Sequence, residues 1–344
     1  MEVFHHSYDP VQLCEYVGDL SQLADAREGI LTAGKADGVR VIDVKTAKGL
    51  AFSVLPTRGM DIAWASYKGI PLSFISKSGV VHPAYFEKDG FGFLRGFTCG
   101  LLTTCGLTYM GAPCEDAGEE LGLHGRISNI PAENVSVSKG WQGDEYVLSV
   151  SGEVSESKMF GENIKLRREF RTTMDSAVLE VHDVVENCGF DKQPFMLLYH
   201  LNFGFPLVSE GTVLVHEKAA VTPRDDEAAK GIAQYHSYEK PTAGYQEQVF
   251  YLDFNACGKA YCGLWNEKLN LGVNIRFHTD EFRYFGLWKM MGKGDYVVGL
   301  EPSTQKPEGR AKARERGELE FLMPGEKREY TFTIEVVENK SDIR

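Results

Sequence analysis

The sequence predicts an all-β protein, a large antiparallel β-sandwich with a short N-terminal helix. Two observations lead to this fold class. Hydrophobic and polar residues alternate with a period of two along much of the chain, and glycine, which occurs 36 times, recurs in the turns between these stretches. The chain has 344 residues, 43% of them hydrophobic, and no break in composition marks a linker. We therefore expect a single domain over residues 1–344.

The expected helix lies in the first twenty residues. Asp9 can cap its N-terminus, and Pro10 suits the first turn, where the amide hydrogen that proline lacks is not needed. Leu13, Tyr16, Val17 and Leu20 then follow at helical spacing.

The clearest strand is 327–339, where apolar and polar residues alternate strictly. Its apolar face would consist of Tyr330, Phe332, Ile334 and Val336. The same alternation marks 145–154, 163–172 and 177–185. The polar stretch 219–247 predicts a long loop with one helical turn, and loops of this kind often shape a binding site over a rigid sheet.

Charge and hydropathy exclude several partner classes. The net charge of -12 argues against a nucleic-acid surface, and the basic cluster 309–317 is interleaved with Glu315, which indicates a solvated face. No apolar run is long enough for a bilayer, and the first ten residues lack the pattern of a signal peptide. We expect no nucleic-acid partner, no membrane partner and a cytoplasmic location.

Cysteine and histidine spacing gives no indication of a metal site. The seven cysteines form no CxxC pair, so they predict neither a zinc ribbon nor a disulfide framework, and small buried thiols are expected instead. The histidines show no HxH or HExxH spacing. The cysteines are Cys14, Cys99, Cys105, Cys114, Cys188, Cys257 and Cys262.

One histidine stands in the apolar and aromatic stretch LLYHLNFGFPL, residues 198–208. His200 could pack, bind a metal or move a proton. A buried imidazole needs partners for both nitrogens, and apolar neighbours lower its pKa toward the neutral form. An isolated histidine is more often a satisfied core residue. Glu301 ends an apolar strand before Pro302, where a carboxylate of raised pKa could serve as a general base.

Other positions carry weaker signals. Arg58 offers a fixed fork of donors, although a structural pair with Asp61 at a strand bend is the simpler interpretation. His124 lies next to a glycine, where backbone can approach a ligand closely, and its plain alternative is a turn histidine. Trp288 and Lys289 could line the same cleft or simply pack within a strand.

The order of these residues along the chain resembles that of the galactose mutarotase (aldose 1-epimerase) family, and in particular a bacterial branch of it. The motifs that carry the resemblance are LPTRGMDI, HGRISNIPA, LYHLNFGFPL and LEPST. The similarity extends from about Gly18 to the last strand. It implies a single-domain β-sandwich, the galactose mutarotase-like supersandwich, whose concave face holds a sugar.

The resemblance also implies roles for individual residues. His200 resembles the general acid that protonates the ring oxygen of a sugar, and Glu301 resembles the base that takes the proton from the anomeric hydroxyl. Arg58 and His124 resemble residues that bind the sugar. Asn202, two residues beyond His200 on the same strand face, could also reach it. Such chemistry would need a donor and an acceptor on opposite sides of the sugar and no cofactor.

The sequence departs from the family pattern at two positions. Well-studied mutarotases have a sugar-binding aspartate in the segment that corresponds to GYQE, residues 244–247. Gln246 stands in its place here and Glu247 follows, which makes Glu247 a further candidate for substrate binding. Thr57 replaces the asparagine that usually precedes the arginine. The sugar is therefore not named by the motifs.

The main prediction is an isomerase that interconverts the anomers of a free sugar or sugar derivative. One alternative is a carbohydrate-binding protein without turnover, because a fold alone does not decide function. Another is an epimerase of a phosphorylated or acidic sugar, for which Arg58, Arg126 and Lys289 could supply an anion site. The expected partner is a small sugar, and a second copy of the chain could cover exposed sheet edges in a homodimer.

Overall fold

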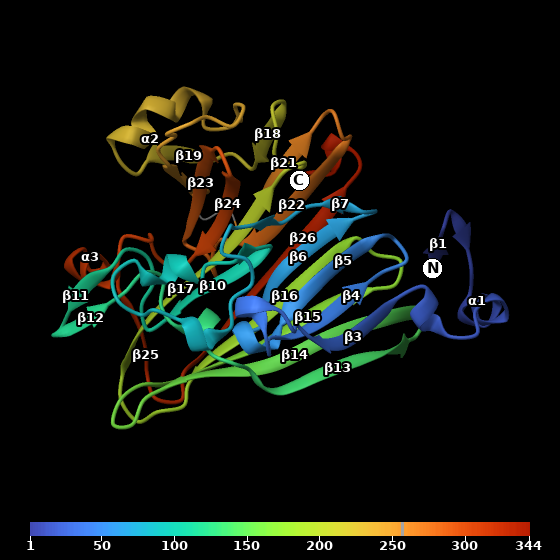
Figure 1. The fold of residues 1–344 in the computed structure, drawn as a ribbon, viewed down its shortest axis with the longest axis horizontal. Helices are drawn as coiled ribbons and strands as arrows, with labels where there is room; N and C mark the ends of the chain where they lie inside the picture. The colour runs from blue at the N-terminus through green and yellow to red at the C-terminus, as the bar shows by residue number, and fades with distance from the viewer. Residues whose placement is uncertain (256–257) are drawn as a thin grey trace.

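The computed structural model describes residues 1–255 and 258–344 and is dominated by two antiparallel sheets that pack face to face (Figure 1). The all-β sandwich predicted from the sequence is confirmed. The larger sheet has 12 strands in the described ranges. Its main path runs through β19 (Ala220–Pro223), β20 (Gln248–Asp253), β23 (Tyr284–Gly292), β24 (Asp295–Ser303), β17 (Gln193–Gly204), β10 (Leu102–Leu107), β6 (Asp61–Tyr67), β5 (Leu50–Leu55), β4 (Arg40–Lys45) and β3 (Asp25–Ile30).

The smaller sheet has eight strands in the same ranges. It consists of β13 (Glu133–Gln142), β14 (Glu145–Ser157), β15 (Asn163–Thr173), β16 (Val178–Asn187), β26 (Lys327–Val337), β22 (Leu271–His278), β21 (Lys259–Asn266) and β18 (Thr212–His216). Short strands extend or flank the sheets: β1 (Glu2–Val3), β2 (His6–Ser7), β7 (Ile70–Pro71), β8 (Phe74–Ile75), β9 (Cys99–Gly100), β11 (Cys114–Asp116), β12 (Glu119–Leu121) and β25 (Glu320–Leu322).

The alternation read from the sequence corresponds to the two faces of the smaller sheet. On β26, the apolar residues Tyr330, Phe332, Ile334 and Val336 are buried in the core between the sheets, whereas the intervening residues are at least partly exposed. Strands β14, β15 and β16 coincide with the other predicted strands. Because successive side chains of a strand point to opposite faces, one apolar residue in two is enough to cover one side of the core.

The described helices are short. The predicted N-terminal helix is α1 (Pro10–Tyr16), capped by Asp9, whose side chain accepts from the amide of Gln12 at 2.8 Å. The stretch expected as a loop with one helical turn, 219–247, also contains strand β19 beside α2 (Asp226–Gly231). No helix in the described part of the chain has the length and hydropathy needed to cross a lipid bilayer.

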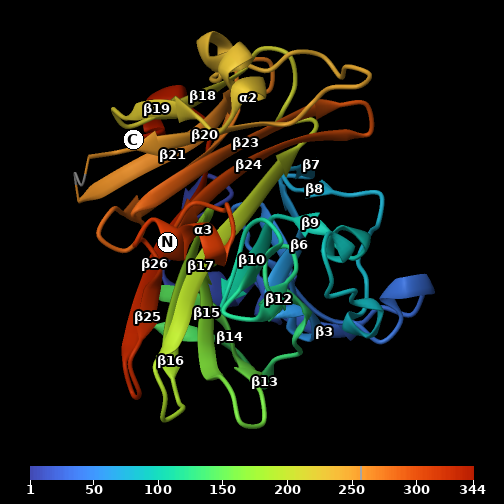
Figure 2. The same cartoon turned by 90° about the vertical axis from the view of Figure 1, so that its left-hand side faces the viewer.

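The basic cluster around 309–317 is not simply a solvated face. It forms α3 (Arg310–Glu315), which lies over one end of β17 (Figure 2). Arg310 is only 4% exposed, and its Nε donates to the Asp116 carboxylate at 2.7 Å. The expectation of a solvated face is wrong for this residue because it is buried in an ion pair with β11.

The cysteines follow the expectation of buried thiols only in part. Cys99, Cys105 and Cys262 are buried and free, whereas Cys14 is exposed. Cys257 lies outside the described residues.

A buried arginine joins the two sheets. Arg168 on β15 is 1% exposed, and its guanidinium donates to both carboxylate oxygens of Asp183 on β16, at 2.9 and 2.6 Å. It also donates to the hydroxyl of Thr104 on β10 at 2.7 Å. Tyr199 on β17 donates its hydroxyl to Asp183 at 2.6 Å. Groups from both sheets thus satisfy one buried ion pair, which ties β10 and β17 to the smaller sheet.

We expect removal of this buried arginine to cost far more stability than removal of the exposed arginine beside it. Arg168→Met leaves Asp183 as an uncompensated buried charge and should lower the free energy of unfolding by about 3–5 kcal/mol. Arg167→Met breaks pairs with Glu153 and Glu186 at the surface and should change it by about 0–1 kcal/mol. Urea unfolding measures both, and equal losses would contradict the role assigned to Arg168.

Candidate active site

The alternation of β17 places His200 on the outer face of the larger sheet. The odd-numbered residues of the strand, Tyr199 and Leu201 among them, pack in the core between the sheets. The even-numbered Met196 and Leu198 belong to a separate cluster on the other side, beneath α3. His200 follows the even-numbered set, so its imidazole faces away from the main core.

The register between β17 and β24 places Glu301 beside His200. Leu201 on β17 lies opposite Leu300 on β24. Because the two strands are antiparallel, this register sets His200 opposite Glu301. Nε2 of His200 is 3.3 Å from Oε1 of Glu301, and the two side chains are only 6% and 4% exposed. The two groups therefore lie side by side on one face, rather than on opposite sides of a sugar as the resemblance led us to expect.

Two glycines leave room for the Glu301 carboxylate. Gly286 lies opposite Glu301 on β23, and Gly299 precedes it by two residues on β24. A Cβ atom at Gly286 would lie 2.9 Å from Oε2, and one at Gly299 would lie 2.6 Å from Oε1. A larger residue at either position would displace the carboxylate.

Burial shifts the pKa of both groups toward the neutral form. It lowers the pKa of His200 to about 4, against smaller opposing effects of Asn202 and Glu247. It raises the pKa of Glu301 to about 8; the negative charge of Glu247 adds to this shift and Arg224 opposes it. A histidine and a carboxyl group with such shifted pKa values, in contact and facing a cavity, are typical of a catalytic acid–base pair.

A cavity of about 340 Å³ lies over the pair. Its walls are mainly apolar and aromatic, with a few polar groups, as in most small-molecule sites. The apolar lining comprises Phe91, Leu94, Phe97, Ala112, Leu123, Val249, Trp288 and Pro307. The polar lining comprises His124, His200, Arg224, Glu247 and Glu301.

Glu247 lines this cavity at its edge and links two other lining residues. Its Oε1 accepts from the guanidinium of Arg224 at 3.0 Å, and its Oε2 accepts from Nε1 of Trp288 at 2.9 Å. The second hydrogen bond fixes the orientation of the indole, whose ring lies 5.2 Å from the His200 ring in an edge-to-face arrangement. A fixed aromatic wall therefore stands directly beside the acid–base pair.

His124 lies on the other side of His200. The ring centroids of His124 and His200 are 5.6 Å apart, in a near-perpendicular arrangement. Burial and the neighbouring His200 lower the pKa of His124 to about 3, and its Nδ1 has no hydrogen-bond partner within the described protein. His124 thus contributes to the lining a neutral imidazole whose Nδ1 keeps an unused hydrogen-bonding capacity.

Arg58 lies outside the cavity lining and holds one wall in place. Its guanidinium donates to the carbonyl oxygens of Val81 at 2.8 Å and Gly96 at 3.0 Å, and to the side chain of Asn129 at 2.8 Å. These bonds hold both ends of the loop that carries the Phe91, Leu94 and Phe97 side chains of the lining. The structure thus does not place Arg58 against a ligand, and Asp61 is not among its hydrogen-bond partners in the described ranges.

Two other candidates do not line the cavity. Asn202 lies on the same strand face as His200 but is fully buried, and its amide donates to the backbone oxygen of His200 at 2.9 Å. Lys289 follows Trp288 on β23 and therefore faces the opposite side, where its ammonium lies 2.7 Å from Glu239. Trp288 lines the cavity and Lys289 does not.

The sequence reading missed Arg224 and the lining residues of the loop between β8 and β9. Arg224 lies in the polar stretch 219–247, which was expected to shape a site, but nothing in its spacing singled it out. Phe91 directly precedes a 3-10 helix, Gly92–Arg95, and Phe97 lies just before β9, but both elements are too short for periodicity to give a signal.

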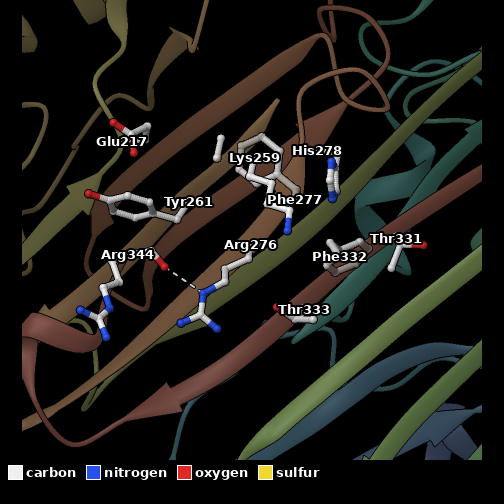
Figure 3. Close-up of a pocket in the computed structure, with 11 residues that line it drawn as sticks. Glu217, Lys259, Tyr261, Arg276, Phe277, His278, Thr331, Phe332, Thr333 and Arg344 are labelled. Atoms are coloured by element: carbon white, nitrogen blue, oxygen red, sulfur yellow. Dashed lines mark hydrogen bonds between the residues drawn. The ribbon is translucent and has the colours of Figure 1, made fainter. Parts of the chain in front are cut away.

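The described ranges contain no group of three or more His, Cys, Asp or Glu side chains arranged to hold a metal ion. A hollow of about 610 Å³ lies on the smaller sheet, against β21, β22 and β26 (Figure 3). There Arg276 donates its Nε–H to the backbone oxygen of Arg344 at 2.8 Å and pairs with Glu335. None of the ion pairs of the described residues joins its histidine, His278, to a carboxylate, so this larger hollow lacks the acid–base contact of the His200 cavity.

Comparison with known proteins places the chain among proteins of this fold. The model of a family described as "Domain of unknown function (DUF4432)" matches residues 36–336. A Klebsiella pneumoniae protein provisionally named an aldose 1-epimerase is 25% identical, with a TM-score of 0.88 over 94% of this chain and 88% of its own. No curated protein matches the sequence.

Two more distant structures share the fold. A galactose mutarotase-like protein from Clostridium acetobutylicum has a TM-score of 0.63 at 15% identity, over 92% of this chain and 99% of its own. A galactose 1-epimerase from Lactobacillus acidophilus has a TM-score of 0.60 at 12% identity, over 92% of this chain and 99% of its own. At these identities the likeness concerns the fold.

We expect the imidazole of His200 to stay neutral well below the ordinary histidine pKa of 6.5, since burial lowers its pKa to about 4. Nitrogen-15 NMR of labelled histidine side chains, followed from neutral pH toward pH 4, measures this directly, with His200→Asn to assign the signal. A His200 signal that titrates near the ordinary value would contradict the buried geometry.

Proposed function

The chain belongs to the family described as "Domain of unknown function (DUF4432)" and has the galactose mutarotase-like fold, and we propose that it interconverts the anomers of a neutral sugar. The observation that carries the proposal is the buried contact of 3.3 Å between His200 and Glu301 at the base of a cavity with aromatic walls.

Anomer interconversion needs one proton donor and one proton acceptor close together. The ring oxygen and the anomeric hydroxyl are bonded to the same carbon, so groups that lie side by side can reach both. One group protonates the ring oxygen while the other takes the proton of the hydroxyl, and the ring opens to an aldehyde. After rotation about the C1–C2 bond, closure reverses both proton transfers and returns His200 and Glu301 to their starting state.

The pair carries one proton near neutral pH. Burial favours the neutral forms, so in the protein alone this proton resides on Glu301, and His200 is the acceptor. The assignment implied by the family resemblance is the reverse, with His200 as the donor. Either assignment places one proton on the pair, so ring opening can begin in either protonation state.

The charges around the cavity favour a neutral sugar over a phosphorylated or acidic one. Arg224 is already paired with Glu247 and Asp225. Arg126 pairs with Glu119 and Glu156, away from the lining. Of the three candidates for an anion site, Arg126 and Lys289 are paired with carboxylates away from the lining, and Arg58 binds carbonyl oxygens outside the cavity. A binding protein without turnover would gain nothing from two buried groups held near each other with shifted pKa values.

We expect His200→Asn and Glu301→Gln each to reduce the acceleration of anomer equilibration by about 10²–10⁴-fold, because each removes one of the two proton-transfer groups. Polarimetry or NMR of freshly dissolved, anomerically pure hexoses, pentoses and deoxysugars measures the rate. His182 and Glu329 offer matched controls, because this His–Glu pair lies on the surface of the smaller sheet, 3.7 Å apart. His182→Asn and Glu329→Gln should retain activity.

The rate should depend on pH as a bell-shaped curve. Below about 4 both His200 and Glu301 are protonated, so the pair has no acceptor; above about 8 neither carries a proton that it can donate. The enzymatic rate, after subtraction of the spontaneous rate at each pH, should therefore fall on both sides of this window. A rate that keeps rising through both values would argue against the pair as the catalytic groups.

A further inference from the structure

A second cavity adjoins the His200 cavity on the outer face of the larger sheet. It measures about 500 Å³ and shares Leu94, Phe97, Glu247 and Trp288 with the first. It extends along β23 and β24 to Met290 and Val297, and its far wall is the segment that follows β8. The two spaces therefore meet along one common wall, in which Trp288 is the largest side chain.

We propose that this second cavity is a subsite for a second neutral sugar ring, and that the substrate is a reducing disaccharide. The inference rests on the proposed function and extends it. The ring with the free anomeric hydroxyl lies over His200 and Glu301, and the ring attached to it lies beyond Trp288.

The strand geometry gives the two rings a continuous surface. Gly286, Trp288 and Met290 alternate with inward-facing residues on β23, so all three lie in a row on the outer face of the sheet. Gly286 lies against Glu301, and Met290 lies in the second cavity. The hydrogen bond from Nε1 of Trp288 to Glu247 holds the indole between them. A chain of two rings laid along β23 would contact these residues in order.

The lining of the second cavity suits a neutral, hydroxyl-rich ligand. Its charged groups are paired: the ammonium of Lys77 lies 2.8 Å from the carboxylate of Asp295, and Glu247 pairs with Arg224 of the first cavity. The other polar lining includes the hydroxyl of Ser78 and the amide of Gln246, and the apolar lining includes Met290. Sugars present hydroxyl groups and apolar C–H faces together, which matches alternating hydroxyl, amide and apolar side chains. A negatively charged second ring would find no unpaired cationic side chain in the described lining of this cavity.

Blocking the second cavity should separate disaccharides from monosaccharides. We expect Met290→Trp and Ser78→Trp, which fill the cavity from opposite walls, to lower kcat/KM for anomerisation of maltose, cellobiose or lactose by about tenfold or more, mainly through KM. The same variants should change kcat/KM for glucose and galactose by less than about twofold. Met323→Trp, at a residue that is 52% exposed, is the matched methionine control.

The outcomes divide clearly. A selective loss with disaccharides in both cavity variants supports the subsite. Wild-type protein that accelerates monosaccharides but none of the three disaccharides overturns it, as does an equal loss for both classes of sugar.

A binding measurement separates failure of the subsite from failure of the proposed function. In protein labelled with carbon-13 at the methionine methyl groups, titration with maltose, cellobiose and lactose should shift the Met290 signal, and glucose and galactose should leave it in place. If no sugar is turned over, the proposed function fails, and a Met290 shift still supports the subsite. If no disaccharide shifts Met290, the subsite is overturned whatever the turnover result.

Discussion

The position of the site depends on the buried ion pair between Arg168 and Asp183. The guanidinium of Arg168 also donates a hydrogen bond to Thr104 from the opposite sheet. The carboxylate of Asp183 also accepts a hydrogen bond from the hydroxyl of Tyr199. Each buried charge neutralises the other, since an unpaired charge between the sheets would cost several kcal/mol. Tyr199 is thereby held inward, and because side chains alternate along a strand, its neighbour His200 must face outward. One internal interaction thus decides which way the candidate catalytic imidazole faces.

The outer face of the larger sheet is chemically unlike the core on the other side of it. His200 Nδ1, Asn202 Oδ1 and His124 Nδ1 are buried without a hydrogen-bond partner in the described protein. Glu301 Oε1 contacts His200 without the geometry of a hydrogen bond. Each such group costs about 1–3 kcal/mol when left unsatisfied, so their concentration around one cavity is a cost in stability that folding alone does not explain. A ligand rich in hydroxyl groups would satisfy those that it can reach.

Much of the wall of the site comes from the connections between strands of the larger sheet. The loop with Phe91, Leu94 and Phe97 is held by Arg58, whose buried guanidinium binds carbonyl groups at both ends of it. Glu247 and Arg224 come from the long connection around β19 and α2. The sheet thus supplies the acid–base pair in a rigid register, and the loops supply the shape of the cavity.

The sequence by itself determined four strands of the smaller sheet, their buried faces and the N-terminal helix, and its motifs singled out His200 and Glu301 as a candidate pair. These depend on local alternation and on motifs, which are properties of neighbouring residues. Tertiary structure alone decided that the pair lies side by side, because strands about 100 residues apart in the chain become neighbours only through sheet register. It also decided that Arg58 supports a loop and that Arg224 reaches Glu247. The partners of long side chains such as Arg58 and Arg224 are set by tertiary packing. Tertiary packing produces no periodic pattern in the sequence from which these partners could be predicted.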